Sequence, residues 1–154
     1  MARFLNNTDY SVLIRNEIKE ILIEAGEDAN EDEAKMLRAE DMAIAQVRSY
    51  LNSRYNVSLS FISYNDEYEN AEDTRNAHLV MVVLDCTLYH LYTSIAPELI
   101  PEFRANRYQD ALEWLKEVMK GDVSAELPKL TNDNGEEKSL IKISSERPNE
   151  DNRW

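Results

Sequence analysis

Apolar residues recur every three or four positions in four separate stretches of this chain. That spacing places them on one side of an α-helix, so each stretch predicts a helix with one face turned toward a core. Residues that start or stop helices lie at the ends: Thr8 or Asp9 caps the first, Pro97 ends the third and Gly121 follows the fourth. The four stretches are residues 8–26, 30–55, 75–96 and 101–121.

The third stretch differs from the others because it is apolar on almost every side. It contains HLVMVVLDCTLYHLY, and such a helix is typical of the centre of a bundle. Its length also approaches that of a membrane span. Asp85 and His90 lie in the middle, where a membrane-spanning helix would carry them at a high cost. We therefore expect a central helix of a bundle and no membrane insertion.

Two segments lack the helical period. Val57, Leu59 and Phe61 alternate with polar residues, which predicts a short extended or β segment, and an acidic loop follows at 62–75. The residues after Gly121 have no helical period either and predict an extended C-terminal arm. The sequence thus predicts an all-α fold. Residues 1–121 form a bundle of about four helices with a short extended or β segment after the second helix, and residues 122–154 form the arm.

Composition narrows the classes of function. The 154 residues include 30 acidic and 17 basic side chains, a formal net charge of −13. This charge repels DNA phosphates and argues against DNA binding through a basic face. One cysteine excludes an intrachain disulfide, and the N-terminus lacks the apolar core of a signal peptide. We expect neither a secreted nor a membrane protein.

Cys86 and His90, one helical turn apart, raise the question of a thiol nucleophile with its base. A catalytic thiol needs an open, electropositive setting, whereas Asp85 and an apolar helix would raise its pKa. The alternative is that Cys86 is a small core residue and His90 a hydrogen-bonded residue near the edge of the bundle. We favour the second interpretation and expect no catalytic residues.

Metal and cofactor motifs are also missing from the sequence. His78, Cys86 and His90 are spread over one helix and cannot converge on one ion. DNGEE at 133–137 is only a fragment of a calcium loop. There is no phosphate-binding glycine loop. We expect no cofactor and no metal.

Asp85 needs a partner, because a carboxylate in a central helix is costly unless it is paired. A hairpin through Pro97 and Pro101 would bring Arg104 and Arg107 of the fourth helix close to it. We predict an Asp85–Arg107 pair that acts as a structural lock, with a tyrosine hydroxyl as the other candidate partner.

Three motifs together resemble a known family. AEDMAIAQVRSYLNSRYNV closes in Y-L-x-x-R-Y, HLVMVVLDCTLYHLY contains D-x-x-L-Y-x-L-Y, and IPEFRANRYQDALEWLKEVMKG contains R-Y-x-D-A-x-x-W-L. In order and spacing they resemble the Mu-like tailed-phage family of small head–tail connector proteins, which are similar to head-completion adaptors. The resemblance covers about residues 8–130, and the tail beyond Pro128 lies outside the shared pattern.

The resemblance implies a helical subunit that forms a ring, often a dodecamer, on the portal protein. The ring would continue the DNA channel and give tail or second-ring proteins a platform. DNA would pass through it without specific binding. The protein would lie in the virion at the head–tail junction after assembly in the cytoplasm of the bacterial host. No catalytic residues are implied.

The tail suggests a partner-binding arm. Leu140, Ile141 and Ile143 lie among small and charged residues, too few for a core but enough to anchor an extended arm on a partner. We expect residues 122–154 to reach the portal or a neighbouring subunit, and the alternative is a disordered terminus.

Two other classes of function compete with the connector. An acidic helical regulator in the cytoplasm, or a DNA mimic that inhibits a nucleic-acid enzyme, would also carry this charge. A small hydrolase using Cys86 is the third reading.

Overall fold

The computed structural model describes residues 3–25, 29–63, 72–132, 135 and 137. Within these residues four long helices form the bundle that the hydrophobic pattern predicts, so the all-α fold is confirmed. A single-turn helix and a 3₁₀ turn complete the described elements. They are α1 (Val12–Ala25), α2 (Ala29–Leu51), α3 (Val57–Ser60), α4 (Ala77–Ile95), η1 (Pro97–Leu99) and α5 (Glu102–Lys120).

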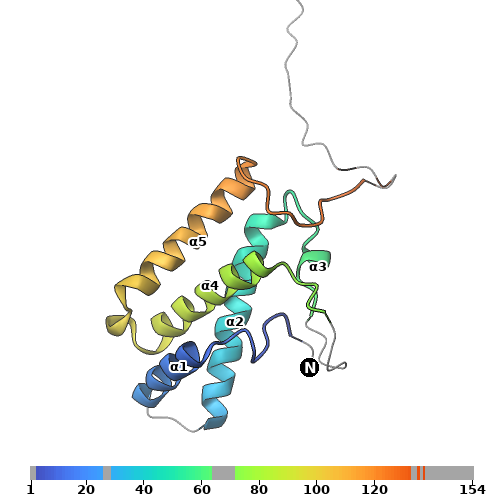
Figure 1. Cartoon of the computed structure of the whole chain (residues 1–154). Helices are drawn as coiled ribbons and strands as arrows, with labels where there is room; N and C mark the ends of the chain where they lie inside the picture. Colours follow the sequence, from blue (N-terminus) through green and yellow to red (C-terminus); the bar gives the residue numbers. More distant parts are fainter. Residues whose placement is uncertain (1–2, 26–28, 64–71, 133–134, 136, 138–154) are drawn as a thin grey trace, which may run out of the picture.

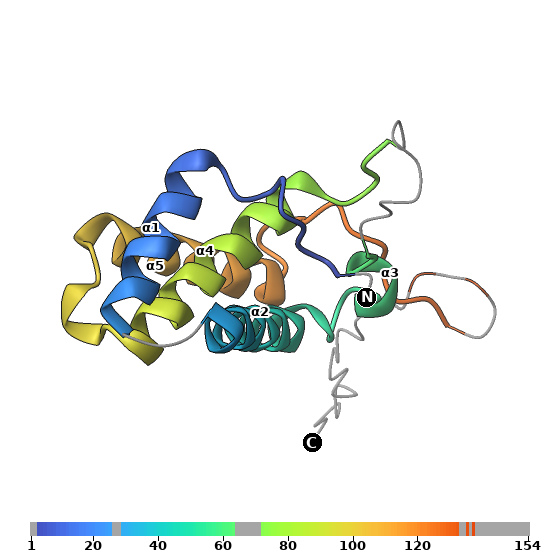
Figure 2. The same cartoon turned by 90° about the horizontal axis from the view of Figure 1, so that it is seen from below.

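The apolar helix α4 is the centre of the bundle. It packs against α1, α2 and α5, and Figure 2 shows α1 and α2 on opposite sides of it. Its buried side chains meet those of α2 and α5 in one core, and each buried leucine or valine contributes roughly 1.5–3 kcal/mol. Core residues of these helices include Ala43, Val47 and Leu51 of α2, Leu79, Val83 and Cys86 of α4, and Leu115 and Val118 of α5.

Local signals fix the ends of α4 and α5. The Asn76 side chain accepts a hydrogen bond from the Leu79 backbone N–H at 2.9 Å and so caps the start of α4. Pro97 follows its end and begins η1, which turns the chain back into α5. Gly121 closes α5 in the left-handed conformation with φ of 90°, and the guanidinium of Arg54 fills the space that a Cβ would need there.

The N-terminal segment corrects the predicted start of the first helix. Helix α1 begins at Val12, after Ser11, whose Oγ accepts from the Ile14 N–H at 3.3 Å. Asp9 does not cap it, because its carboxylate binds Arg75, just before α4, at 2.7 and 2.8 Å. Phe4 and Leu5 are buried in the core, so the residues before α1 are part of the packed domain.

The extended segment predicted around Val57 is wrong. Residues 57–60 form the helical turn α3, because the Asn56 side chain accepts from the N–H groups of Ser58 and Leu59 and starts a helix there. The β-type contact in this region lies two residues before Val57, where Tyr55 pairs with Lys129. Apolar and polar residues do alternate here, but the hydrogen bonds to the Asn56 side chain favour a helical turn over an extended strand.

The chain beyond α5 stays on the bundle for about ten residues. Ala125 and Leu127 are buried in the core, and the Asn56 N–H donates to the Pro128 carbonyl at 2.7 Å. The first part of the predicted arm is therefore packed against the domain. Figures 1 and 2 show that this segment runs from the end of α5 across to the side of α3.

By length and composition, α4 is the one helix among the described residues that would suffice to cross a membrane. Half of its most apolar window is buried inside the bundle, and a buried core helix passes the same test.

Candidate functional site: the α4–α5 pocket

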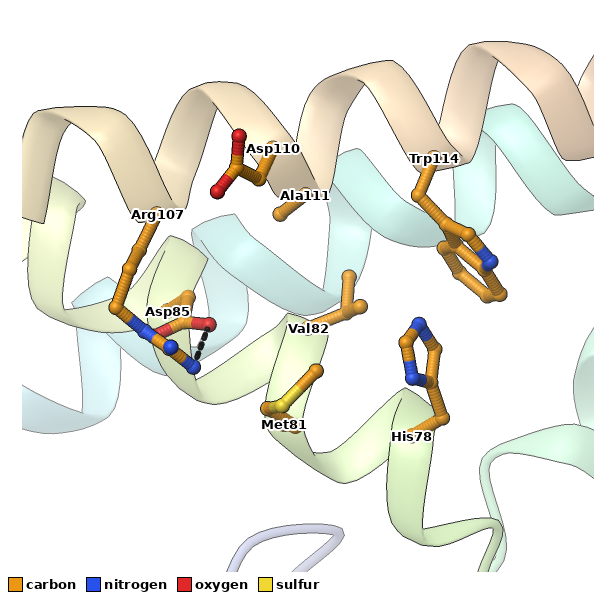
Figure 3. A pocket seen from close by; sticks show the side chains of 8 residues that line it. All are labelled: His78, Met81, Val82, Asp85, Arg107, Asp110, Ala111 and Trp114. Carbon is orange, nitrogen blue, oxygen red and sulfur yellow. Dashed lines mark hydrogen bonds and ion pairs between the residues drawn. The ribbon is translucent and has the colours of Figure 1, made fainter.

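A pocket of about 150 Å³ lies between the first half of α4 and the middle of α5 (Figure 3). A cavity of roughly this size holds one benzene-sized group. The two helices run antiparallel, so residues at intervals of three and four on each helix face the same space. The pocket is lined by His78, Met81, Val82, Asp85, Arg107, Asp110, Ala111 and Trp114.

One end of the pocket is an ion pair between Asp85 and Arg107. Arg107 Nε and Nη2 donate to the two carboxylate oxygens of Asp85, both at 2.8 Å. The structure thus brings together the two side chains singled out in the sequence. The hydrogen bonds and negative charge of Asp85 raise the pKa of Arg107. The Asp85 side chain is 8% exposed and that of Arg107 44%, so the pair has one buried and one accessible member.

Arg104 extends this pair into a cluster that reaches α1. Its Nη1 lies 3.8 Å from Asp85 Oδ1, and its Nε and Nη2 donate to Glu17 of α1 at 2.8 and 2.5 Å. The Tyr92 hydroxyl donates to the same carboxylate at 2.8 Å. Burial alone would raise the pKa of Glu17, but the hydrogen bonds from Arg104 and Tyr92 outweigh it and lower the pKa. The cluster therefore ties together α1, α4 and α5.

The other end of the pocket is aromatic. The rings of His78 and Trp114 lie with their centroids 4.5 Å apart and tilted by 58°. Between this end and the ion pair the walls are apolar, formed by Met81, Val82 and Ala111 (Figure 3). Such a site can accept one apolar side chain and leaves the Arg107 guanidinium available for an acceptor at its edge.

Exposed apolar side chains border the ion cluster on all three helices. Leu13 is 80% exposed, Phe103 53% and Met81 39%. Leu13 lies one helical turn before Glu17, Phe103 one turn before Arg107 and Met81 one turn before Asp85. Residues four apart share one side of a helix, so each apolar side chain lies on the same side of its helix as a member of the ion cluster. We call the α4–α5 pocket together with Leu13, Met81 and Phe103 the groove face.

Cys86 lies behind the pocket in the core. It is fully buried, and burial together with the charge of Asp85 raises the pKa of its thiol to about 12, so the sulfur stays protonated at neutral pH. His90 is half-buried, its pKa is lowered by burial, and its Nε2 lies 2.7 Å from Gln46 Oε1 on α2. These surroundings are those of a core thiol and a hydrogen-bonded histidine.

The described part of the chain has no group of three His, Cys, Asp or Glu side chains placed to hold a metal ion. Leu140, Ile141 and Ile143, the predicted anchors of the arm, lie outside the described residues.

Neither the pocket nor the link from Arg104 to α1 was predicted from the sequence. The sequence does contain a pattern that could have indicated the pocket, because its lining residues recur at helical spacing on both helices. Arg107, Ala111 and Trp114 fall on one side of α5, and His78, Val82 and Asp85 on one side of α4, each set at intervals of three or four. The link to Glu17 has no comparable signal, because it joins residues 87 positions apart.

Most of the chain matches one known protein family. Residues 8–142 match the family model described as Bacteriophage Mu, Gp36. No curated protein and no solved structure matches the sequence. The family match extends past Pro128 through Leu140 and Ile141, which corrects the expectation that the shared pattern stops near residue 130. All three motifs of the sequence and every residue of the pocket lie inside the match, and the chain therefore belongs to the Bacteriophage Mu Gp36 family.

Proposed function

We propose that this protein is a head–tail connector subunit, which forms a ring on the portal protein, continues its DNA channel and joins the capsid to the tail. The observation that carries this proposal is the family match over residues 8–142. It includes the three motifs on which the resemblance to small phage connector proteins rests.

The construction of the domain supports a structural role. The core joins the N-terminal segment, the four long helices and the first residues after α5, and the Glu17–Arg104–Asp85–Arg107 cluster ties α1 to the α4–α5 hairpin. A subunit built this way presents its outer surfaces in a fixed arrangement. That property suits a ring whose subunits must repeat the same contact.

Charge supports the proposal as well. A formal net charge of −13 repels DNA phosphates, so a channel lined by this protein would let DNA slide without adhering. The same charge also favours the second candidate, an acidic regulator or DNA mimic. A mimic would bind a basic enzyme in place of DNA, and its binding would weaken steeply with salt.

The test is removal of the gene from the phage that carries it, with the intact gene supplied in trans as a control. A connector is required after packaging, so heads that have lost it should fill with DNA, fail to join tails and lose their DNA on storage. Electron microscopy and DNA-retention assays measure these outcomes. Tailed, infectious particles from the deletion strain would reject the proposal.

A second experiment separates the connector from the mimic. The purified full-length chain is mixed with purified portal rings and, separately, with duplex-binding enzymes of the host. Light scattering and electron microscopy then report ring formation on the portal. A stable complex with a basic enzyme and none with the portal would favour the mimic.

A further inference from the structure

The groove face is a surface that lacks an occupant among the described residues. Leu13 and Phe103 are each more than half exposed and lie one helical turn from members of the ion cluster, which forms one end of the α4–α5 pocket. An apolar patch with a polar rim marks an interaction site on many soluble proteins. Asp110 of α5 lines the pocket (Figure 3), and its side chain is exposed to solvent.

One segment of this chain has the complementary chemistry. Residues 138–145, KSLIKISS, contain two lysines and no acidic residue, although acidic side chains outnumber basic ones 30 to 17 over the whole chain. Leu140, Ile141 and Ile143 are its apolar residues. The family match ends at residue 142, so residues 138–142 of this segment fall inside it.

We propose that residues 138–145 of one copy occupy the groove face of a neighbouring copy. This proposal rests on the proposed function and names the contact by which one subunit of the ring holds the next. An isoleucine of the segment fills the α4–α5 pocket against Trp114, and a second apolar residue contacts Phe103. Lys138 and Lys142 lie close to Asp110, where their charge is favourable.

The path of the chain favours a neighbour over the same copy. After α5 the described chain crosses to the α3 side (Figures 1 and 2). There the Lys129 ammonium lies 2.8 Å from the Glu137 carboxylate. The segment therefore starts from the side of the bundle away from α5. A contact between two different surfaces of identical subunits is heterologous, and repetition of such a contact forms a ring when the rotation from one subunit to the next closes.

The test is disulfide cross-linking in the full-length protein, assembled at high concentration or on portal rings. One variant carries Met81→Cys at the pocket and a second carries Ile141→Cys in the segment. Met42→Cys, on α2, is the matched control because Met42 is also a partly exposed methionine, 44% against 39%. The native Cys86 is fully buried and contributes only background.

A mixture of the Met81→Cys and Ile141→Cys variants should give at least tenfold more cross-linked dimer than the Met42→Cys and Ile141→Cys mixture. The double variant Met81→Cys/Ile141→Cys should form ladders of linked chains. Equal cross-linking at Met42 would refute the proposal. So would a double variant that closes only within single chains, because the segment would then bind its own copy.

Trp114 provides an independent readout. In the full-length Trp154→Phe variant it is the only remaining tryptophan, and it lines the pocket. Assembly should shift its fluorescence to shorter wavelength, and a peptide of residues 137–146 added in excess should compete for the pocket and dissociate the assembly. A peptide with aspartate at 140, 141 and 143 should do neither. If both peptides act alike, the pocket is not the binding site.

The two proposals fail in distinguishable ways. If the chain forms rings on the portal but gives no Met81–Ile141 cross-link, the connector function is supported and the proposed contact is rejected. If the cross-link forms but the phage joins heads to tails without this protein, the contact is supported and the connector function is rejected.

Discussion

Two arginine clusters hold this molecule together, and they differ in how far solvent reaches them. Arg75 binds Asp9, Asp73 and the Phe4 carbonyl, and its side chain is 2% exposed. Arg107 binds Asp85 at the edge of the α4–α5 pocket, and its side chain is 44% exposed. A fully desolvated arginine cannot lose its partners without leaving buried charge, whereas an accessible one exchanges them for water. We infer that the Arg75 cluster maintains the fold and the Arg107 pair remains available for recognition.

The largest effect should come from Arg75→Met. The change leaves the Asp9 carboxylate, 10% exposed, and a buried carbonyl without their main donor, and breaking a buried pair in this way costs about 3–5 kcal/mol. Urea unfolding followed by circular dichroism measures the loss. Lys19→Ala, an exposed residue of α1, is the control and should change the free energy of unfolding by less than about 0.5 kcal/mol. Equal stability of the two variants would show that the N-terminal segment does not depend on Arg75.

A matched pair of arginines on α5 sharpens the comparison at intermediate size. Arg104 is buried between Glu17 and Asp85, so Arg104→Met should cost about 2–4 kcal/mol. Arg107→Met removes both hydrogen bonds to the buried Asp85 carboxylate but leaves Arg104 Nη1 3.8 Å from it, so its cost should be smaller, about 1–3 kcal/mol. The measurement is again urea unfolding. If Arg107→Met destabilises the protein more than Arg104→Met does, the exposed fraction of an arginine side chain would not indicate which of the two stabilises the fold.

Glu17 makes the link to α1 dependent on pH. Its pKa in the folded protein lies below the ordinary value of 4.5, so its contribution is fully present above about pH 4.5 and is lost as pH falls through the folded pKa. Glu17→Gln removes that contribution. The stability difference between the wild type and the variant should therefore be largest near neutral pH and shrink below about pH 4.5. A difference that grows on acidification would contradict the assignment, and unfolding at a series of pH values decides it.

Local signals in the sequence were sufficient for the four long helices but not for the contacts between distant elements. Asn76, Pro97 and Gly121 fix the ends of α4 and α5, because they act on adjacent backbone. Asp85 and Arg107 meet across a short hairpin, so the turn between α4 and α5 already limits the choice of partner. The position of α1 over this hairpin depends on the packing of the whole bundle. The turn at Asn56 was missed because a side-chain cap outweighed the alternation of apolar residues.

The smallest effects on stability are expected for aspartate substitutions at two partly exposed methionines, and these variants test recognition separately from folding. Met81 lies in the pocket wall and is 39% exposed, and Met42 on α2 is 44% exposed. Met81→Asp and Met42→Asp should each change the free energy of unfolding by less than about 1 kcal/mol, since neither fills the core. Only Met81→Asp should reduce assembly, because it places a charge where the neighbour's apolar residues are expected to bind. Light scattering on portal rings measures assembly, with urea unfolding of the same samples as the control. A large loss of stability at Met81 would make the pocket wall part of the fold, and equal assembly of both variants would remove the groove face from the interface.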